Sequence, residues 1–412
     1  MNTTKKEGSS TPGSGPLRIA LFIDIYFPNV DGVVRTVDAY ARNLQAMGHD
    51  VFVVAPREQG TEADENLPYR VYRQSSVKLP GFPANVPLAH CSRELREAFE
   101  TAPPDIIHAH SPFLTSRLAL QLGKKYHVPV FATFHSKYYD DALNVTHSKL
   151  LARLMVKHVV RFFSRADHVW ACSAMTAQTL RSYGYGGTIH VMENGVDLTE
   201  APQNLEELRQ TAVERFSIPT DRPLLLFVGQ LIWQKNLRLI LDSLKRLADR
   251  GELHELLVVG EGYHGQAIAA YSRELGLENR VHFLGKIADR KLLFGIYGAS
   301  DLMFFPSLYD NAPLVLREAA LAAVPSLLAA GSNAAEVVED GVNGYLAVPE
   351  AEAMERRILE IFSDPAGRLA VGQKAKQTIP VSWSQIVERV VQAYRSGSKE
   401  GHTHALEADA GL

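Results

Sequence analysis

The residues with the clearest chemical potential are two carboxylates eight positions apart, Asp310 and Glu318, in the stretch SLYDNAPLVLREAALAAVP at 307–325. An apolar run at 301–305 predicts a buried strand before them, and Pro313 suits the first position of a following helix, where its missing N–H is no loss. The helix start then presents free backbone N–H groups, those of Ala312, Leu314 and Val315. Carboxylates that flank free amides suit a ligand with hydroxyl groups and negative charge, which describes a sugar nucleotide. An exposed turn aspartate is the alternative for Asp310 taken alone.

A lysine and two glycines lie where predicted strands end and predicted helices begin. In VGQLIWQKNL, Gly229 ends a strand and Lys235 precedes a helix at 237–247. A lysine beside free helix N–H groups suits a diphosphate, although a solvated loop lysine fits the same pattern. Gly32 likewise precedes a predicted helix at 33–44, where a plain tight turn is the alternative.

His135 directly follows a predicted strand at 129–133, so its side chain is expected to project into a cleft. A structural role is the alternative for a lone histidine. The residues after it are polar and suit hydroxyl recognition on the acceptor side: Tyr138, Tyr139, Asp140 and Asp141. The two adjacent aspartates could suggest a metal, but neighbouring loop residues rarely chelate alone, so we expect no metal site.

The glycines of VGEGYHG, Gly260, Gly262 and Gly265, match the spacing of a dinucleotide-binding fingerprint between a strand and a helix. That fingerprint normally belongs to the first βαβ unit and has an acidic residue after the next strand. Here the next predicted strand, at 280–284, is followed by Gly285 and a lysine. The pattern therefore favours a loop that lines a phosphate or a base, and a nucleotide-dependent oxidoreductase is the less favoured alternative.

Short apolar runs alternate with longer amphipathic segments, which predicts parallel sheets covered by helices on both faces. The predicted strands lie at 18–23, 51–55, 105–108, 129–133, 168–171 and 188–192, and then at 224–228, 255–259, 280–284, 301–305 and 325–328. We therefore predict an α/β protein with two doubly wound, Rossmann-like domains that face each other across a cleft. The predicted divisions are a disordered tail at 1–16, an acceptor-side domain at 17–200, a donor-binding domain at 201–380, a helix at 381–396 that crosses back to the first domain, and a disordered tail at 397–412.

The bulk composition excludes several classes of protein. With 412 residues, 46% of them hydrophobic, 22% charged and a net charge of −3, the chain resembles an ordinary globular protein and not a nucleic-acid binder. Cys91 and Cys172 lack metal-ligand spacing and are expected to be reduced core thiols. We expect no signal peptide and no membrane span, and hence a cytoplasmic protein.

One predicted helix, in LNVTHSKLLARLMVKHVVRFFSRADH at 143–168, is strongly amphipathic. Its basic residues recur every four positions: Lys149, Arg153, Lys157, Arg161 and Arg165. Its other face is apolar: Leu151, Met155, Val156, Val159, Phe162 and Phe163. The helix either covers the sheet with a solvated basic face, or binds a membrane surface at the inner face of a membrane.

Several of these motifs together carry a resemblance to a known family: FPNVDGVVRTVDAYARNLQAMGHDVFVVAP, DIIHAHSP, ATFH, ENGVDL, VGQLIWQKNL, VGEG, LGKI and FFPSLYDNAPLVLREAALAAVPSLLAAGSNAAEVVEDGVNGYL. In this order, over residues 17–395, the chain resembles the retaining GT-B glycosyltransferases of family 4, including lipid-glycosylating members such as diacylglycerol glucosyltransferases. The resemblance implies transfer of a hexosyl group from a nucleoside diphosphate sugar to an acceptor hydroxyl, without a metal or other cofactor. It favours UDP-hexose as donor, with GDP-mannose second, and a lipid such as diacylglycerol as acceptor.

The resemblance also implies roles for single residues. Glu318 matches the second acid of the family's E-x7-E motif and is implied to bind the ribose hydroxyls, whereas Asp310 matches the first and is implied to bind the hexose. Lys235 is implied to neutralise the diphosphate, and His135 to lie beside the reacting sugar; with Asp310 they form the expected catalytic set. The other implied donor contacts are Gly32, Arg35, Gly229, Gln230, Gly262, Asn311, Ala312, Pro313, Leu314 and Val315.

The chain departs from the family pattern at three positions. Asp310 replaces the usual glutamate, and Gln230 stands where an arginine clamp for phosphate is usual, so that Lys235 would carry more of the charge with help from Arg35. Ala323 replaces a common glycine, which we interpret as local packing. The first two departures allow a further alternative. In it, the chain is a catalytically weak homologue that serves as a partner subunit.

Overall fold

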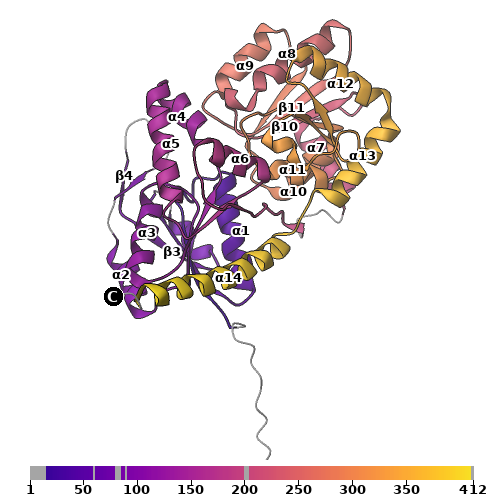
Figure 1. Ribbon diagram of the computed structural model, residues 1–412. Coiled ribbons are helices and arrows are strands. Elements are labelled where there is room, and N and C mark those ends of the chain that lie inside the picture. Colours follow the sequence, from indigo (N-terminus) through magenta and orange to yellow (C-terminus); the bar gives the residue numbers. More distant parts are fainter. Residues whose placement is uncertain (1–14, 59–60, 79–84, 89–90, 199–203, 410–412) are drawn as a thin grey trace, which may run out of the picture.

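The computed structural model describes residues 15–58, 61–78, 85–88, 91–198 and 204–409, and it shows two α/β units side by side (Figure 1). The tail predicted at 1–16 lies almost entirely outside these residues, as does the predicted domain boundary at 200 and 201.

The first sheet has seven parallel strands in the order β3-β2-β1-β6-β7-β8-β9. They are β1 Arg18–Phe22, β2 Asp50–Pro56, β3 Arg70–Gln74, β6 Ile106–Ala109, β7 Val130–Phe134, β8 His168–Ala171 and β9 His190–Val191. A small antiparallel pair, β4 Ser76–Val77 and β5 Val86–Pro87, lies beside it. The inner strands are buried on both faces, which is why they are continuous apolar runs in the sequence.

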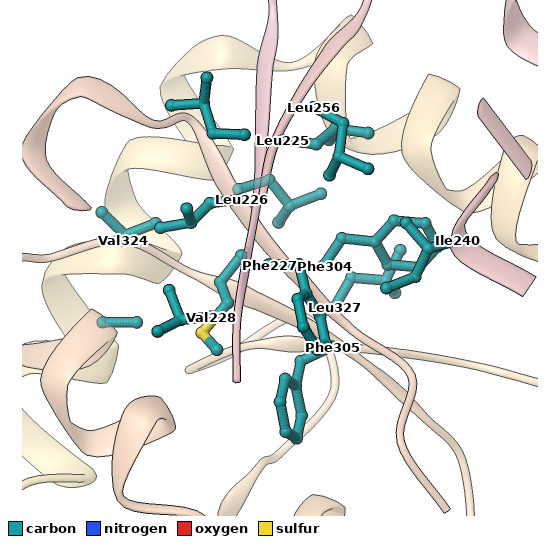
Figure 2. Packing of buried hydrophobic residues seen from close by; sticks show 14 of the residues in the cluster. Leu225, Leu226, Phe227, Val228, Ile240, Leu256, Phe304, Phe305, Val324 and Leu327 are labelled. Carbon is teal, nitrogen blue, oxygen red and sulfur yellow. The ribbon is translucent and has the colours of Figure 1, made fainter. Parts of the chain in front are cut away.

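The second sheet has six parallel strands in the order β12-β11-β10-β13-β14-β15. They are β10 Leu224–Val228, β11 Glu255–Val259, β12 Val281–Gly285, β13 Leu302–Phe305, β14 Ser326–Ala329 and β15 Tyr345–Ala347. Figure 2 shows the core of this unit, where leucine, valine and phenylalanine side chains of β10 and β13 pack together with Ile240 and Leu327. The predicted pair of doubly wound sheets is therefore confirmed.

Helices cover both sheets, as expected for parallel strands joined by crossover connections. They are α1 Gly32–Ala46, α2 Arg93–Thr101, α3 Leu114–Tyr126, α4 Tyr138–Thr146, α5 Lys149–Phe163, α6 Ala174–Ser182, α7 Leu205–Phe216, α8 Leu237–Asp249, α9 Gly265–Glu274, α10 Arg290–Ala299, α11 Leu314–Leu321, α12 Ala351–Ser363, α13 Pro365–Thr378 and α14 Trp383–Asp409. The 3-10 turns in the described part of the chain are η1 Thr61–Asn66, η3 Trp233–Lys235 and η4 Asn333–Val337.

The last helix, α14, returns from the second unit and runs along the first, as predicted (yellow in Figure 1). Trp383 packs edge-on against Tyr40 of α1, and Tyr394 stacks on Trp170 of β8. The tail predicted at 397–412 begins inside α14, which continues to Asp409. No proline interrupts this stretch, and each residue added to an existing helix gains a hydrogen bond without a new nucleation cost.

The amphipathic segment at 143–168 is two helices and not one. His147 adopts a left-handed conformation, with φ of 50°, and ends α4, after which α5 begins at Lys149. Arg165 lies beyond the end of α5. Val159 and Phe163 are buried against the sheet as predicted, but Leu151, expected on the buried face, has 49% of its surface exposed.

Candidate active site

A cleft of about 690 Å³ opens where the carboxyl ends of the two sheets meet, the place where open α/β sheets bind ligands. The loop after β1, the residues after β7 and the turns after β10, β11 and β13 all reach it. All the residues predicted to bind the donor line this cleft: Gly32, Arg35, His135, Gly229, Gln230, Lys235, Gly262, Asp310, Asn311, Ala312, Pro313, Leu314, Val315 and Glu318.

Lys235 and Asp310 form the central charge pair of the cleft. The Lys235 Nζ lies 2.6 Å from Oδ1 of Asp310, and Ser307 donates a hydrogen bond of 2.6 Å to the other carboxylate oxygen. Lys235 ends the short turn η3, and its ammonium nitrogen lies over the ring of Phe305 at the end of β13, 5.4 Å from the ring centroid. Strand β13 and its neighbour β10 therefore bring together two residues that are 75 positions apart in sequence.

Glu318 is buried in α11 and has partners that no sequence pattern predicted. Arg290 donates to its Oε1 at 2.8 Å, and the Tyr297 hydroxyl donates to its Oε2 at 3.0 Å. Both residues belong to α10. Arg35 reaches the same carboxylate from the first unit, at 3.8 Å, so this arginine lies beside Glu318. Its help to Lys235 in balancing the charge of a diphosphate stays a prediction.

The start of α11 offers two backbone donors to the cleft. The helix begins at Leu314, so Pro313 is its N-cap residue and not its first helical residue as predicted. Proline has no side-chain group that could cap the helix, and in the described part of the chain no acceptor faces the amides of Leu314 and Val315. Asn194 of the first unit holds this turn in place through a bond of 3.1 Å from its side-chain amide to the carbonyl of Ala312.

His135 belongs to a buried cluster of three histidines. Nδ1 of His110 lies 3.2 Å from Nε2 of His135, and His108 lies against His110 with 4.1 Å between ring centroids. His108 is itself held by Thr133 and by Tyr394 of α14, at 2.7 and 2.6 Å. Burial lowers the pKa of His135 to about 4, so its ring is neutral at pH 7.

The cluster also determines which nitrogen of His135 carries the hydrogen. Among the described residues, nothing bonds to the buried Nε2 of His110. A buried N–H without an acceptor is rarer than a bare lone pair, so we assign the hydrogen of His110 to Nδ1, which donates to His135. The His135 ring then carries its own hydrogen on Nδ1 and brings an N–H donor to the cleft.

The first helix, α1, begins at the cleft with Gly32. Asp31 caps the helix by accepting a hydrogen bond of 2.8 Å from the amide of Val34, and burial raises the pKa of the Asp31 carboxyl. A Cβ placed on Gly32 would meet no atom within 4 Å, so the space beside its backbone is open. This geometry is compatible with the predicted close approach of a phosphate group to Gly32.

The residues predicted on the acceptor side do not line the cleft. Tyr138 is buried in the core of the first unit between Phe113 and Phe134, because its ring faces back toward the sheet from the first turn of α4. Tyr139 is half-buried and Asp140 is exposed at the surface. The cleft wall next to His135 is made instead by Ser136 and Lys137.

Several contacts join the two units around the cleft. Lys137 donates to the carbonyl of Leu308 at 2.6 Å, and the Tyr309 hydroxyl donates to the carboxylate of Asp141. Burial raises the pKa of Asp141 to about 6. Glu336 of the second unit accepts two hydrogen bonds of 2.8 Å from backbone amides in the first turn of α6. None of these contacts was predicted, because each depends on how the two units dock.

The glycines of the dinucleotide-like motif serve close packing between two loops. A Cβ on Gly260 would come within 1.9 Å of the carbonyl oxygen of Gly229, and one on Gly262 within 2.5 Å of the carbonyl oxygen of Leu231. The loops after β10 and β11 therefore touch backbone to backbone. Packing alone accounts for Gly260 and Gly262, without any dinucleotide.

Ala323 adopts a left-handed backbone conformation, with φ of 57°. The family's preference for glycine at this position is therefore a requirement of the backbone and not of local packing, so that interpretation was wrong. Gln230 lines the cleft, as expected for the position of a phosphate clamp, but carries no charge.

Within the described residues, no group of three or more histidine, cysteine, aspartate or glutamate side chains could hold a metal ion. None of the described helices combines the length and apolar character needed to cross a bilayer. Cys91 and Cys172 are both free thiols.

Two family models and several known proteins match this chain over most of its length. The family model described as Glycosyltransferase Family 4 matches residues 30–200, and that described as Glycosyl transferases group 1 matches residues 209–378. An alpha-monoglucosyldiacylglycerol synthase from Streptococcus pneumoniae is 25% identical over 340 residues, which cover 80% of this chain and 75% of that protein. A GDP-mannose-dependent alpha-mannosyltransferase from Corynebacterium glutamicum is 26% identical over 337 residues, covering 80% and 76%.

Solved structures agree over nearly the whole chain. The crystal structure of Anabaena HepE with UDP and glucose has a TM-score of 0.71 at 20% identity and covers 92% of this chain and 100% of that one. The sucrose-phosphate synthase of Thermosynechococcus elongatus has a TM-score of 0.76 at 21% identity and covers 92% and 98%. At this level of identity, the likeness demonstrates a shared fold.

Proposed function

The chain belongs to the GT-B glycosyltransferases of family 4, and on that premise we propose that it transfers a hexosyl group from a UDP-hexose to a lipid hydroxyl with retention of anomeric configuration. Hexosyl transfer from a nucleoside diphosphate sugar follows from the family itself. The choice of UDP, the retention, the lipid acceptor and the roles of single residues are the proposed part.

The observation that carries the proposal is the contact between Lys235 and Asp310 beside the start of α11. A hexose 1-diphosphate has hydroxyl groups at one end and two phosphates at the other. We assign the hydroxyl end to Asp310 and the diphosphate to Lys235, together with the amides of Leu314 and Val315. Glu318, about one turn along the same helix, then faces the ribose.

In this arrangement the rate of transfer depends on how well the leaving diphosphate is stabilised. The bond between C1 of the hexose and the phosphate oxygen breaks, a bond between C1 and the acceptor oxygen forms on the same face, and the acceptor proton passes to the departing phosphate. Lys235 and the α11 amides lie where they can stabilise the charge that develops on that oxygen. His135, neutral and carrying hydrogen on Nδ1, orients a sugar hydroxyl.

A uridine donor is supported by the fold relative that binds UDP and glucose, and the similarity to a GDP-mannose-dependent enzyme keeps GDP-mannose as the second candidate. A lipid acceptor is supported by the similarity to a monoglucosyldiacylglycerol synthase and by exposed leucines on α5. On this proposal the protein works at the inner surface of a membrane.

The catalytically weak partner subunit remains the second candidate, and it rests on Gln230 and Asp310. The charge pair of Lys235 with Asp310 and the partners of Glu318 argue against it, since a site without function has no need to hold four charged groups in one cleft.

Thermal unfolding in the presence of single ligands tests the proposal. A ligand at about one hundred times its dissociation constant stabilises a protein by about 2.7 kcal/mol. We expect UDP and UDP-glucose to raise the melting temperature without added metal, and GDP, GDP-mannose and NAD to raise it less. A larger shift with GDP-mannose than with UDP-glucose would mean that the donor carries guanine and not uracil. The absence of a shift with every nucleotide would favour the partner-subunit alternative.

A further inference from the structure

A second large hollow, of about 750 Å³, lies between α3 and α5 in the first unit, away from the cleft. Its lining is basic and apolar: Arg117, Leu120, Gln121, Lys124, His158, Arg161, Phe162 and Arg165. We call it the α3–α5 groove. It contains three arginines, a lysine and a histidine, and no carboxylate.

Within the described residues, the positive charges of the groove have no carboxylate partner. In the described part of the chain, none of the three arginines and neither nitrogen of His158 forms an ion pair with a carboxylate, and the same holds for Lys124. Arg117 instead donates to Nδ1 of His158 at 2.8 Å, and Nε2 of that ring lies 3.2 Å from the carbonyl of Pro112. Burial, and after it the charges of the neighbouring arginines, lower the pKa of His158.

The surface beside the groove is apolar. Val145, Leu150, Leu151 and Leu154 have 74%, 66%, 49% and 51% of their surface exposed, and they form what we call the α4–α5 tip. These leucines lie on the same side of α5 as three groove residues, His158, Arg161 and Arg165. At about 100° per residue, all six positions fall within about a third of the circumference of the helix or its continuation. One face of the helix is therefore apolar at its start and basic at its end.

We propose that the α3–α5 groove binds the phosphate of an anionic lipid headgroup while the α4–α5 tip enters the acyl layer of the membrane. Exposure of aliphatic side chains to water is unfavourable, and their transfer into the interface of a bilayer is favourable. A nucleic acid would match the charges of the groove but not the leucines, and the net charge of −3 does not favour a polyanion elsewhere.

Membrane docking at this surface rests on the proposed function, in which the acceptor is a lipid. Helix α4 runs from Lys137, in the cleft wall, to the tip, and its nine residues span about 14 Å. Docking through the groove and the tip would therefore hold the mouth of the cleft close to the membrane surface, within reach of a lipid hydroxyl.

Co-sedimentation with vesicles tests the groove. The probes are vesicles of phosphatidylcholine alone and vesicles that contain phosphatidylglycerol, at low and high salt. We expect binding only to the anionic vesicles, released by salt. The double variant Arg161→Gln/Arg165→Gln should lower the partition coefficient about thirtyfold. The matched control is Lys374→Gln/Lys376→Gln, which removes two exposed charges from α13 and should bind as the wild type does.

Two further measurements separate the possible outcomes. Leu150→Ser/Leu154→Ser should also weaken vesicle binding, because it removes the apolar part of the tip while leaving the groove intact. Soluble dihexanoyl phosphatidylglycerol should raise the pKa of His158, followed by NMR, and inorganic phosphate should raise it only at much higher concentration. All variants should bind UDP like the wild type, so a failure of the donor site would be recognised separately. Wild-type vesicle binding by the groove variant, or tighter binding of an oligonucleotide than of anionic vesicles, would overturn the proposal.

Discussion

The pair of Lys235 and Asp310 offers a test that separates the diphosphate from the hexose. On the proposed roles, Lys235→Gln removes the cation that faces the diphosphate, whereas Asp310→Asn removes the carboxylate that competes with the diphosphate for the Lys235 ammonium. The two substitutions act on the same 2.6 Å contact and should nevertheless change UDP binding in opposite directions.

The magnitudes follow from the chemistry of the contact. A hydrogen bond to a charged group contributes about 1.5–3 kcal/mol, so Lys235→Gln should weaken UDP binding by about 10- to 150-fold. Asp310→Asn leaves Lys235 with a neutral amide neighbour, and UDP should bind about two- to fivefold more tightly, a gain of about 0.5–1 kcal/mol. The same variant should lose most of the additional affinity that UDP-glucose has over UDP.

Isothermal titration of both variants with UDP and with UDP-glucose provides the assay, and Lys374→Gln is the control for an unrelated loss of charge. Circular dichroism would establish that each variant is folded. The reasoning is refuted if both substitutions weaken UDP binding equally, because the pair would then act only as a structural salt bridge.

Four other perturbations give distinct outcomes. Glu318→Gln should weaken UDP binding by about 1–3 kcal/mol in calorimetry, since an amide accepts poorly from ribose hydroxyls; an unchanged affinity removes that role. Asp141→Asn should raise the free energy of unfolding by up to about 3 kcal/mol at pH 8 and hardly at all below pH 4. The reason is that burial raises the pKa of this carboxyl from 3.8 to about 6, so its ionisation above that pH destabilises the folded state. His110→Phe should lower turnover about 10- to 100-fold and change its pH profile with little change in UDP affinity, and His110→Asn should restore part of it, if His110 positions His135. Ala323→Gly should raise the melting temperature by about 2–4 °C, since the left-handed backbone strains alanine by about 1–2 kcal/mol; an unchanged value would mean that the strain is relieved elsewhere.

Strands buried on both faces were predictable because apolar side chains must continue along the whole strand. The predicted limits of β8 and β10 agree with the structure to the residue. The edge strand β3, with the sequence RVYRQ, was missed because its charged and amide side chains hide the pattern of a buried strand. The break between α4 and α5 was missed for a different reason: a histidine, and neither glycine nor proline, takes the left-handed conformation there.

The site residues that follow a strand end could be predicted from the sequence. Those whose position depends on how helices and the two units pack together could not. Lys235, Asp310 and Glu318 lie next to predicted strands and helices, and they line the cleft as expected. The partners of Glu318 lie 28 and 21 residues away on α10, and no local pattern indicates that this helix faces α11. His110 could have been found, because His108 and His110 are separated by two positions at the end of a strand, which places both on one face.

The charge pairs within the cleft also bear on selectivity between a whole nucleotide sugar and its parts. Lys235 is held by Asp310, and Glu318 is held by Arg290, so a ligand that takes one member of a pair leaves the other without its partner. On the proposed roles, UDP alone would satisfy Lys235 and deprive Asp310, whereas free glucose would do the reverse. Leaving a largely buried charged group unsatisfied costs more than an ordinary hydrogen bond contributes. A sugar joined to its diphosphate satisfies both members at once. The pairing therefore favours the intact donor over its separate parts, and discrimination of this kind would follow from the internal salt bridge without any additional contact to the ligand.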